Sequence, residues 1–363
     1  MRPLMLLLAV AACGDNVLPA DAAALTPLER FGKRLFEDDG LSEPRGQSCA
    51  SCHDPGHGFA SADVVARGSH PDRTGGRNVP TALYASFVPA FAVVETDDGP
   101  TPTGGLFWDG RADDLAQQAG GPLLNPVEMA NTDKAMVVAK VRRAGDAGQV
   151  ALAPDVDAAF AQLTEAIAAY EQTEGFHPFT SRFDAYLRGE GDLSPVEARG
   201  LALFLDPEKG NCVACHAART DSRDPRDWLF TDFTYDSLGI PRNAAIPANT
   251  DPAHYDLGLG VRLDDTTLYG AFRVPGLRDV ALTSPYGHNG YFQTLRDVVA
   301  FYATRDVTPA RWYPDRPYDD LPAAYAHNVN TDEVPYKSQG GQPRLSDDEI
   351  DAIVAFLEAL TDR

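Results

Sequence analysis

The residues best suited to chemistry form two copies of one motif, Cys-x-x-Cys-His. The two copies are Cys49-Ala-Ser-Cys52-His53 and Cys212-Val-Ala-Cys215-His216. This spacing is typical of c-type haem attachment, in which two thiols bond to the porphyrin vinyl groups and the adjacent imidazole binds the iron. The sequence therefore predicts two covalently bound haem c groups, with both histidines as proximal iron ligands.

Other uses of paired cysteines fit this sequence less well. A zinc site with four cysteines separates its pairs by about 15–20 residues, and the gap between Cys52 and Cys212 is far longer. Two thioredoxin-like redox pairs would not each require a histidine directly after the second cysteine. A disulfide within a C-x-x-C segment closes too short a loop to restrain the unfolded chain much.

The ligand on the opposite face of each iron decides whether a haem transfers electrons or binds a substrate. The chain has four methionines, and none follows the second haem motif. A methionine from its own half is therefore excluded as a ligand of the second iron. The remaining candidates in that half are several tyrosines and His254, His288 and His327.

The segments that lead to the two motifs resemble each other. Residues 26–29 and 194–197 each contain a hydroxyl residue, a proline and, two positions after the proline, a glutamate. This pattern is a capping box with proline in the first helical turn, so it predicts a helix before each cysteine pair. Apolar residues at helical spacing predict further helices over 156–170 and 346–360.

An opening helix, a haem motif and a closing helix outline a small cytochrome c unit. We therefore predict a mainly α-helical chain of two tandem cytochrome c-like haem domains, with long connecting loops and little sheet. The expected domains are residues 25–176 and 177–363. The alternative is one mixed α+β domain that carries both haems.

The first residues indicate export. Arg2 precedes an apolar run over residues 4–12 that is too short to span a bilayer. We interpret residues 1–12 as a lipoprotein signal peptide, Cys13 as the lipidated first residue of the mature chain, and 13–24 as a tether. The alternative is an ordinary signal peptide cut nearby. The mature chain is expected in the periplasm or on the outer side of a bacterial membrane.

The formal net charge of −22 limits the choice of partners. A surface this acidic repels phosphate backbones, which excludes a nucleic-acid function. It favours encounter with basic proteins instead.

Several segments resemble bacterial di-haem cytochrome c peroxidases and the MauG-type enzymes of the same superfamily. They are Arg-Asn-Val-Pro-Thr at 77–81, the run from Phe-Trp-Asp-Gly-Arg at 107–111 through 129, Phe-Arg-Val-Pro at 272–275 and Leu-Thr-Ser-Pro-Tyr at 282–286. The resemblance covers essentially the mature chain and includes both haem motifs.

The resemblance implies roles for residues near the first haem. Glu128 would be the distal acid and base, with Gln118 beside it and Pro122 shaping the pocket. Cleavage of a peroxide O–O bond requires a group that moves a proton from one oxygen to the other, and a carboxylate performs this transfer. Trp108 would lie between the haems as an oxidisable relay. The alternative interpretation of Gln118 and Glu128, which needs no resemblance, is a pair of polar surface residues at a helix end.

The resemblance also implies metal ligands. Asn78 and the carbonyl groups of Thr283 and Pro285 would bind a calcium ion between the haems, a ligand set that suits a hard cation. Tyr302 occupies the position at which the peroxidases carry a methionine ligand of the second haem, and MauG-type enzymes place tyrosine there. His70 matches a displaceable ligand of the first haem in the peroxidases, which MauG-type enzymes generally lack.

We therefore expect a peroxide-dependent di-haem oxidoreductase. Its partners would be hydrogen peroxide and a small cytochrome or another exported electron donor. The first alternative is a MauG-type enzyme that oxidises residues of a partner protein. The second is an electron-transfer cytochrome without turnover, which predicts that neither iron accepts an external ligand.

Overall fold

The computed structural model describes residues 25–97, 99–144 and 150–363. The expected signal peptide, Cys13 and the tether lie outside the described residues. Helices dominate, and strands form only two small two-stranded sheets among the described residues. This confirms the predicted mainly helical fold with little sheet.

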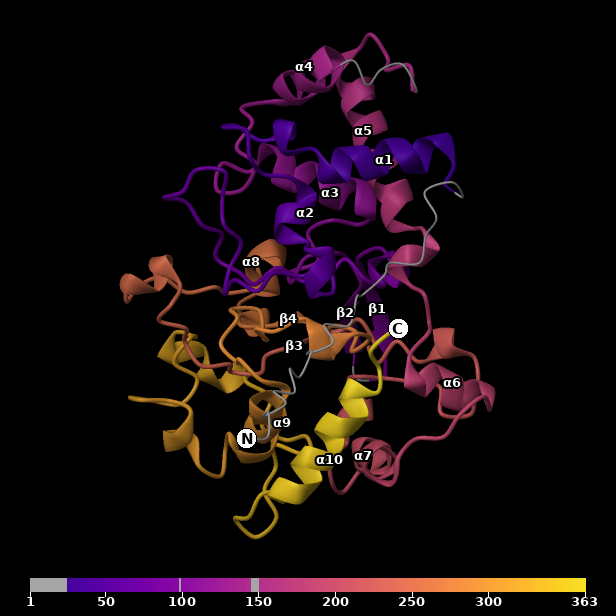
Figure 1. Ribbon diagram of the computed structural model, residues 1–363. Helices are drawn as coiled ribbons and strands as arrows, with labels where there is room; N and C mark the ends of the chain where they lie inside the picture. Colours follow the sequence, from indigo (N-terminus) through magenta and orange to yellow (C-terminus); the bar gives the residue numbers. More distant parts are fainter. Residues whose placement is uncertain (1–24, 98, 145–149) are drawn as a thin grey trace, which may run out of the picture.

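Among the described residues, the first half of the chain carries five α-helices. They are α1 (Pro27–Glu37), α2 (Cys49–Cys52), α3 (Leu115–Leu124), α4 (Lys134–Ala144) and α5 (Val156–Glu171). Helices α1 and α2 lie side by side (Figure 1). Within the described chain, the second half also carries a set of five α-helices. It consists of α6 (Arg182–Arg188), α7 (Pro195–Leu205), α8 (Leu259–Leu263), α9 (Leu295–Thr304) and α10 (Asp347–Glu358).

The predicted capping boxes are present at the start of α1 and α7, and α10 begins with a third one at Ser346. In α7 the Ser194 hydroxyl accepts from the Glu197 backbone N–H, and the Glu197 carboxylate accepts from the Ser194 N–H at 2.8 Å. Thr26 with Glu29 makes the same exchange. These bonds satisfy backbone donors that a helix start would otherwise leave unpaired.

One close helix crossing organises each half. Helix α1 crosses α5 at Gly32, where an added Cβ would lie 1.8 Å from the Ala166 carbonyl oxygen. Helix α7 crosses α10 at Gly200, where an added Cβ would lie 2.0 Å from the Ala352 carbonyl oxygen. Only glycine allows the backbones to approach this closely. Figure 1 shows both crossings, α1 with α5 and α7 with α10.

Two main groups of buried apolar side chains follow this division. One draws its members from residues 25–176 and the other from residues 183–360. The predicted domain boundary at 176/177 falls between them and stays a prediction.

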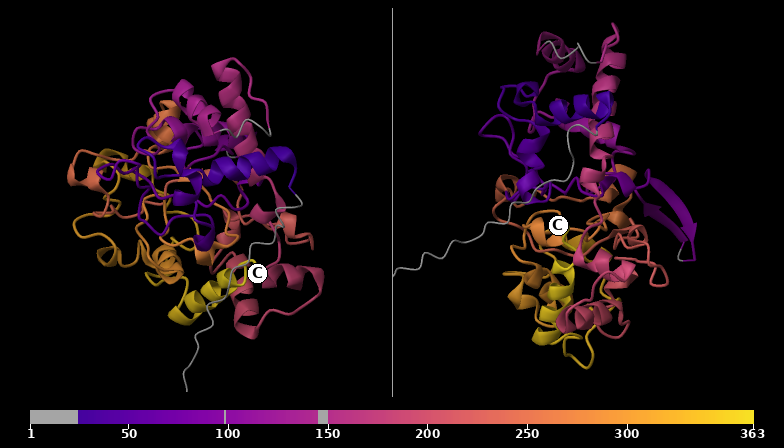
Figure 2. Two further views of the ribbon diagram at one scale, coloured as in Figure 1. Left: turned by 45° about the horizontal axis from the view of Figure 1, so that its top comes forward. Right: turned by 45° about the vertical axis from the view of Figure 1, so that its right-hand side comes forward.

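The strands play a small part. Strands β1 (Ala92–Thr96) and β2 (Gly99–Thr103) form an antiparallel hairpin that projects from the body (Figure 2). Strands β3 (Tyr235–Asp236) and β4 (Phe272–Arg273) pair inside the second half. Among the described residues, no helix has the length and apolar character needed to cross a bilayer.

Contacts between the halves fix the two cysteine pairs relative to each other. Arg77 forms a two-pronged ion pair with Asp256, at 2.5 and 2.7 Å. The Asn78 backbone N–H donates to the His288 carbonyl at 2.8 Å. The imidazole Nε2 of His57 lies 2.5 Å from the Ser284 carbonyl oxygen.

Candidate haem sites and the cavity between them

Both histidines of the haem motifs are oriented in the same way. His53 Nδ1 lies 3.1 Å from the Phe59 carbonyl oxygen, and His216 Nδ1 lies 3.0 Å from the Phe230 carbonyl oxygen. A proton held on Nδ1 by a carbonyl leaves Nε2 free as a metal ligand. Burial lowers the pKa of both imidazoles, which favours the neutral form that binds iron.

A cavity of about 860 Å³ borders both Cys-x-x-Cys-His motifs. All four of their cysteines are free thiols, and burial raises the pKa of each. Buried thiols of this kind are poor nucleophiles and metal ligands by themselves. They fit instead the role of thioether partners for a group that fills the cavity.

Arg273 provides an independent test of whether the cavity suits haem. Its side chain lines the cavity, and no carboxylate of the described residues lies within ion-pair distance of it. Burial lowers the pKa of this guanidinium. A desolvated cation needs an anionic partner, and haem carries two propionates. The donor set and the unpaired cation therefore fit bound haem.

The predicted distal residues lie in this cavity with His53. Gln118 is on α3, which begins at the N-cap Asp114 and contains Pro122. Glu128 follows α3, and all three cavity residues, Gln118, Pro122 and Glu128, border the same space. Burial raises the pKa of the Glu128 carboxyl, against the opposing effects of the Arg111 charge and a hydrogen bond with Asn125.

Trp108 lies where the two halves meet. Its indole N–H donates to the Asn78 carbonyl at 2.9 Å, and its own carbonyl accepts from the Arg273 backbone N–H at 2.9 Å. The side chain also borders the cavity. Trp108 therefore contacts residues of both halves in the space between the two haem motifs.

Tyr302 borders the cavity from α9, on the side of the second cysteine pair. Its ring stacks on Tyr336, with centroids 5.5 Å apart and planes 19° apart. The Arg305 guanidinium lies 4.2 Å from the Tyr336 ring centroid. Burial raises the pKa of Tyr302, and so do the nearby Cys215 and Asp236. The phenol is thus desolvated next to the second haem site.

The whole arrangement matches known proteins. Residues 27–192 match the family model described as di-haem cytochrome c peroxidase. The methylamine utilization protein MauG of Paracoccus denitrificans is 40% identical over 382 residues, covering 100% of this chain and 95% of that protein. The chain belongs to the di-haem cytochrome c peroxidase and MauG family.

Further members of the family support this assignment. The cytochrome c551 peroxidase of Pseudomonas aeruginosa is 32% identical, over 74% of this chain and 70% of that protein. The crystal structure of the diheme peroxidase BthA from Burkholderia thailandensis matches with a TM-score of 0.87 at 44% identity, over 95% of this chain and 87% of that one. Family membership confirms the predicted peroxidase class and the two haem c groups.

The three predicted calcium ligands lie close to the haem cavity. Asn78, Thr283 and Pro285 all border the cavity, and Asn78 is buried. The Asn78 amide donates to the carbonyls of Asp63 and Val64, both at 3.4 Å. This orientation leaves the amide oxygen free to bind a cation. The calcium site itself stays a prediction.

His70 is not among the residues that border the cavity. Its loop packs on the segment that carries Glu128, because the Ser69 N–H donates to the Glu128 carbonyl at 2.7 Å. The loop is also held at Arg73, which donates to the Pro126 carbonyl at 3.1 Å. Ligation of the first haem by His70 stays a prediction.

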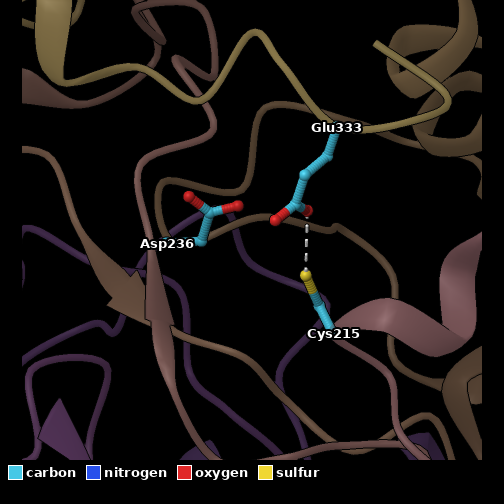
Figure 3. Close-up of side chains that lie close together, drawn as sticks. All are labelled: Cys215, Asp236 and Glu333. Carbon is cyan, nitrogen blue, oxygen red and sulfur yellow. Dashed lines mark hydrogen bonds between the residues drawn. The ribbon is translucent and has the colours of Figure 1, made fainter. Parts of the chain in front are cut away.

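Several side chains at the cavity carry no signal in the sequence, among them Glu171, Arg273 and Tyr336. Arg273 belongs to the Phe-Arg-Val-Pro segment at 272–275, but nothing in the sequence shows that it donates to the Phe107 carbonyl and that no carboxylate of the described residues pairs with it. Asp236 and Glu333 also come close to Cys215, whose Sγ lies 3.6 Å from the Glu333 carboxylate (Figure 3). Because Cys215 is a predicted haem-attachment residue, we assign these carboxylates to the surroundings of the second haem motif and not to a separate metal site.

Proposed function

We propose that the protein reduces hydrogen peroxide at the first haem site, with electrons that enter at the second site from a small periplasmic cytochrome or a similar exported donor. The observation that carries the proposal is that Glu128 and Gln118 share one cavity with His53. The overall reaction consumes one peroxide, two electrons and two protons and releases two waters. A basic donor would be attracted by the net charge of −22.

Cys49, Cys52 and His53 would hold the first haem, which would supply a redox-active iron for peroxide reduction. Gln118 orients the peroxide through its amide. The Glu128 carboxylate takes a proton from one peroxide oxygen and delivers it to the other, which leaves as water. Trp108, placed between the two sites, provides the aromatic relay along which electrons reach the first site.

Replacement of Glu128 by glutamine tests the proton transfer. The amide keeps the size of the side chain but has no carboxylate, so we expect turnover to fall by about 10²–10⁴-fold. Because the raised pKa of Glu128 belongs to a group that must be ionised to act, wild-type turnover should rise with pH through that pKa, and the variant should lose this dependence. Glu95→Gln, on the exposed hairpin, is the control. Wild-type turnover in Glu128→Gln would remove the assigned role.

A MauG-type reaction is the second candidate, and Tyr302 favours it. We propose that His216 and Tyr302 bind the second iron, since the phenol borders that site and no methionine lies in the second half. A phenolate stabilises oxidised iron and would make the second haem a poor acceptor from a high-potential cytochrome. Peroxide turnover with reduced cytochromes, run beside mass spectrometry of co-encoded exported proteins, separates the two reactions.

We also propose a calcium ion bound by Asn78, Thr283 and Pro285, and a periplasmic location with Cys13 as the lipid anchor. A hard cation suits the amide and carbonyl oxygens that these three residues supply. For the anchor, Cys13→Ser should move the protein from the detergent phase to the aqueous phase when cells are extracted. Unchanged partitioning would count against lipidation.

A further inference from the structure

A second pocket of about 250 Å³ lies beside α3. The residues that it shares with the haem cavity are Phe107, Arg111, Pro122, Asn125 and Glu128. Its other lining residues include Gln117 and Gly121. The pocket therefore adjoins the haem cavity, and Glu128 borders both spaces.

The outer end of this pocket is exposed. Arg111, Gln117 and Gly121 are exposed, whereas Pro122 and Glu128 are half-buried. A small molecule that enters between Arg111 and α3 thus meets Glu128 next. Nothing in the mechanism proposed above uses Arg111 or the pocket.

Arg111 and Phe107 form one wall. The Arg111 guanidinium lies 3.6 Å from the Phe107 ring centroid and donates to the Asp109 carboxylate at 2.8 Å. Phe107 has a φ of 63°, a conformation that is unfavourable for residues other than glycine. Stacking on Phe107 and the ion pair with Asp109 hold the Arg111 guanidinium in place, so its positive charge lies at the edge of the pocket.

Gly121 forms the opposite wall. An added Cβ at this position would lie 3.4 Å from Phe107 Cζ, so a larger side chain would extend into the pocket. At the neighbouring Gly120, an added Cβ would instead meet the Phe160 ring of α5, also at 3.4 Å. The two adjacent glycines therefore face different surroundings, one the pocket and the other the core.

We propose that this pocket is the passage by which hydrogen peroxide reaches Glu128 from solvent, with Arg111 and Phe107 as its fixed wall and Gly121 keeping it open. The inference rests on peroxide reduction at the first haem site. The polar groups that line the pocket suit a small, neutral, hydrogen-bonding substrate. The Arg111 charge gives anions a path through a surface that otherwise repels them, because the chain carries a net charge of −22.

The test measures ligand entry and not only turnover. Stopped-flow absorbance gives the association rate constants of cyanide and of peroxide with the holoprotein, in the ferric and one-electron-reduced states. In Gly121→Leu we expect both constants to fall about tenfold or more, equivalent to a barrier higher by about 1.4 kcal/mol. Gly121→Ala should fall between this variant and wild type, and Gly120→Ala should match wild type.

Equilibrium binding identifies the cause. A narrowed passage slows entry and exit together, so the cyanide dissociation constant of Gly121→Leu should stay at the wild-type value. Gln117→Trp, at an exposed position on the rim, is a second obstruction that does not depend on helix packing. Arg111→Gln should slow azide, an anion, more than it slows peroxide.

The inference is overturned if cyanide and peroxide enter Gly121→Leu and Gln117→Trp as fast as wild type. It is also overturned if the cyanide dissociation constant rises in step with the slower entry, because the site itself is then damaged. Every variant of the Gly121 series keeps Glu128, so the proton that hydrogen cyanide releases on binding is taken up in the same way in each of them. A failure of the proposed function would therefore appear in Glu128→Gln turnover and leave the cyanide kinetics of the Gly121 series intact.

Discussion

Glu171 is expected to make the stability of the folded protein depend on pH. It is the last residue of α5 and borders the haem cavity near Cys49. The side chain is only 5% exposed, and its Oε2 has no hydrogen-bond partner among the described residues. Burial raises the pKa of this carboxyl to about 8. The folded protein therefore holds a proton on Glu171 at neutral pH.

The magnitude follows from linkage between protonation and folding. The ordinary pKa of glutamate is 4.5, and the folded value is about 8. Between these values the unfolded chain releases a proton that the folded chain keeps, so stability falls as pH rises through this window. About 3.5 pH units at about 1.4 kcal/mol each amount to about 5 kcal/mol by pH 8. Glutamine cannot ionise, so Glu171→Gln should recover most of this loss.

Urea unfolding of the holoprotein at pH 5, 6.5 and 8, followed by circular dichroism, measures the effect. The variant and wild type should differ little at the lowest pH and most at the highest, with the variant more stable there. Glu165→Gln changes an exposed glutamate of the same helix and should leave the wild-type pH profile unchanged. A Glu171→Gln profile parallel to wild type would falsify the assignment of a buried neutral carboxyl.

Three further predictions concern the metal sites and the core. Tyr302→Met should change the low-spin ferric EPR signal of the second haem and raise its reduction potential, and an unaltered signal would mean that another group binds this iron. Chelation of calcium by EGTA should shift the spectra of both haems and be reversed by added calcium, and Asn78→Ala should reproduce the shift. Asp184→Ala should destabilise the second half by about 3–5 kcal/mol, because it leaves Arg278 buried without its 2.6 Å ion-pair partner. Thermal unfolding measures the loss of stability, and we expect Asp184→Asn to lose less than Asp184→Ala.

Short sequence motifs predict much of the fold. The haem motifs and the capping boxes at Thr26 and Ser194 are short, because their chemistry depends on residues a few positions apart. Gly32 lies six residues after the N-cap Thr26, and Gly200 lies six residues after the N-cap Ser194. The two glycines therefore occupy the same position in the two repeated segments. Only the structure shows why glycine is needed there, since the reason is a carbonyl on another helix.

The parts of the site that the sequence did not reveal depend on distant segments. Tyr336 stacks on Tyr302 from a loop with no motif. Glu171 directly follows the helix predicted over 156–170, and its burial comes from the fold around it. That no carboxylate of the described residues pairs with Arg273 is likewise a property of the assembled cavity. Spacing along the chain contains no information about such contacts.

The internal repeat also explains why the two haem sites differ. An isolated bridge pairs Leu106 with Ala112 before α3, and the same bridge pairs Tyr286 with Phe292 before α9. The two helices begin at N-caps 114 and 294. Eight residues after each cap lie Pro122 and Tyr302, and both border the cavity.

The same position in the two halves therefore carries side chains of opposite chemistry. The proline ring has no atom that binds a metal, so in the proposed reaction the equivalent face of the first site is left to the substrate and to Glu128. The phenol at 302 carries an oxygen that binds oxidised iron. In the proposed reaction, this difference at one repeated position distinguishes the site that accepts peroxide from the site in which Tyr302 binds the iron.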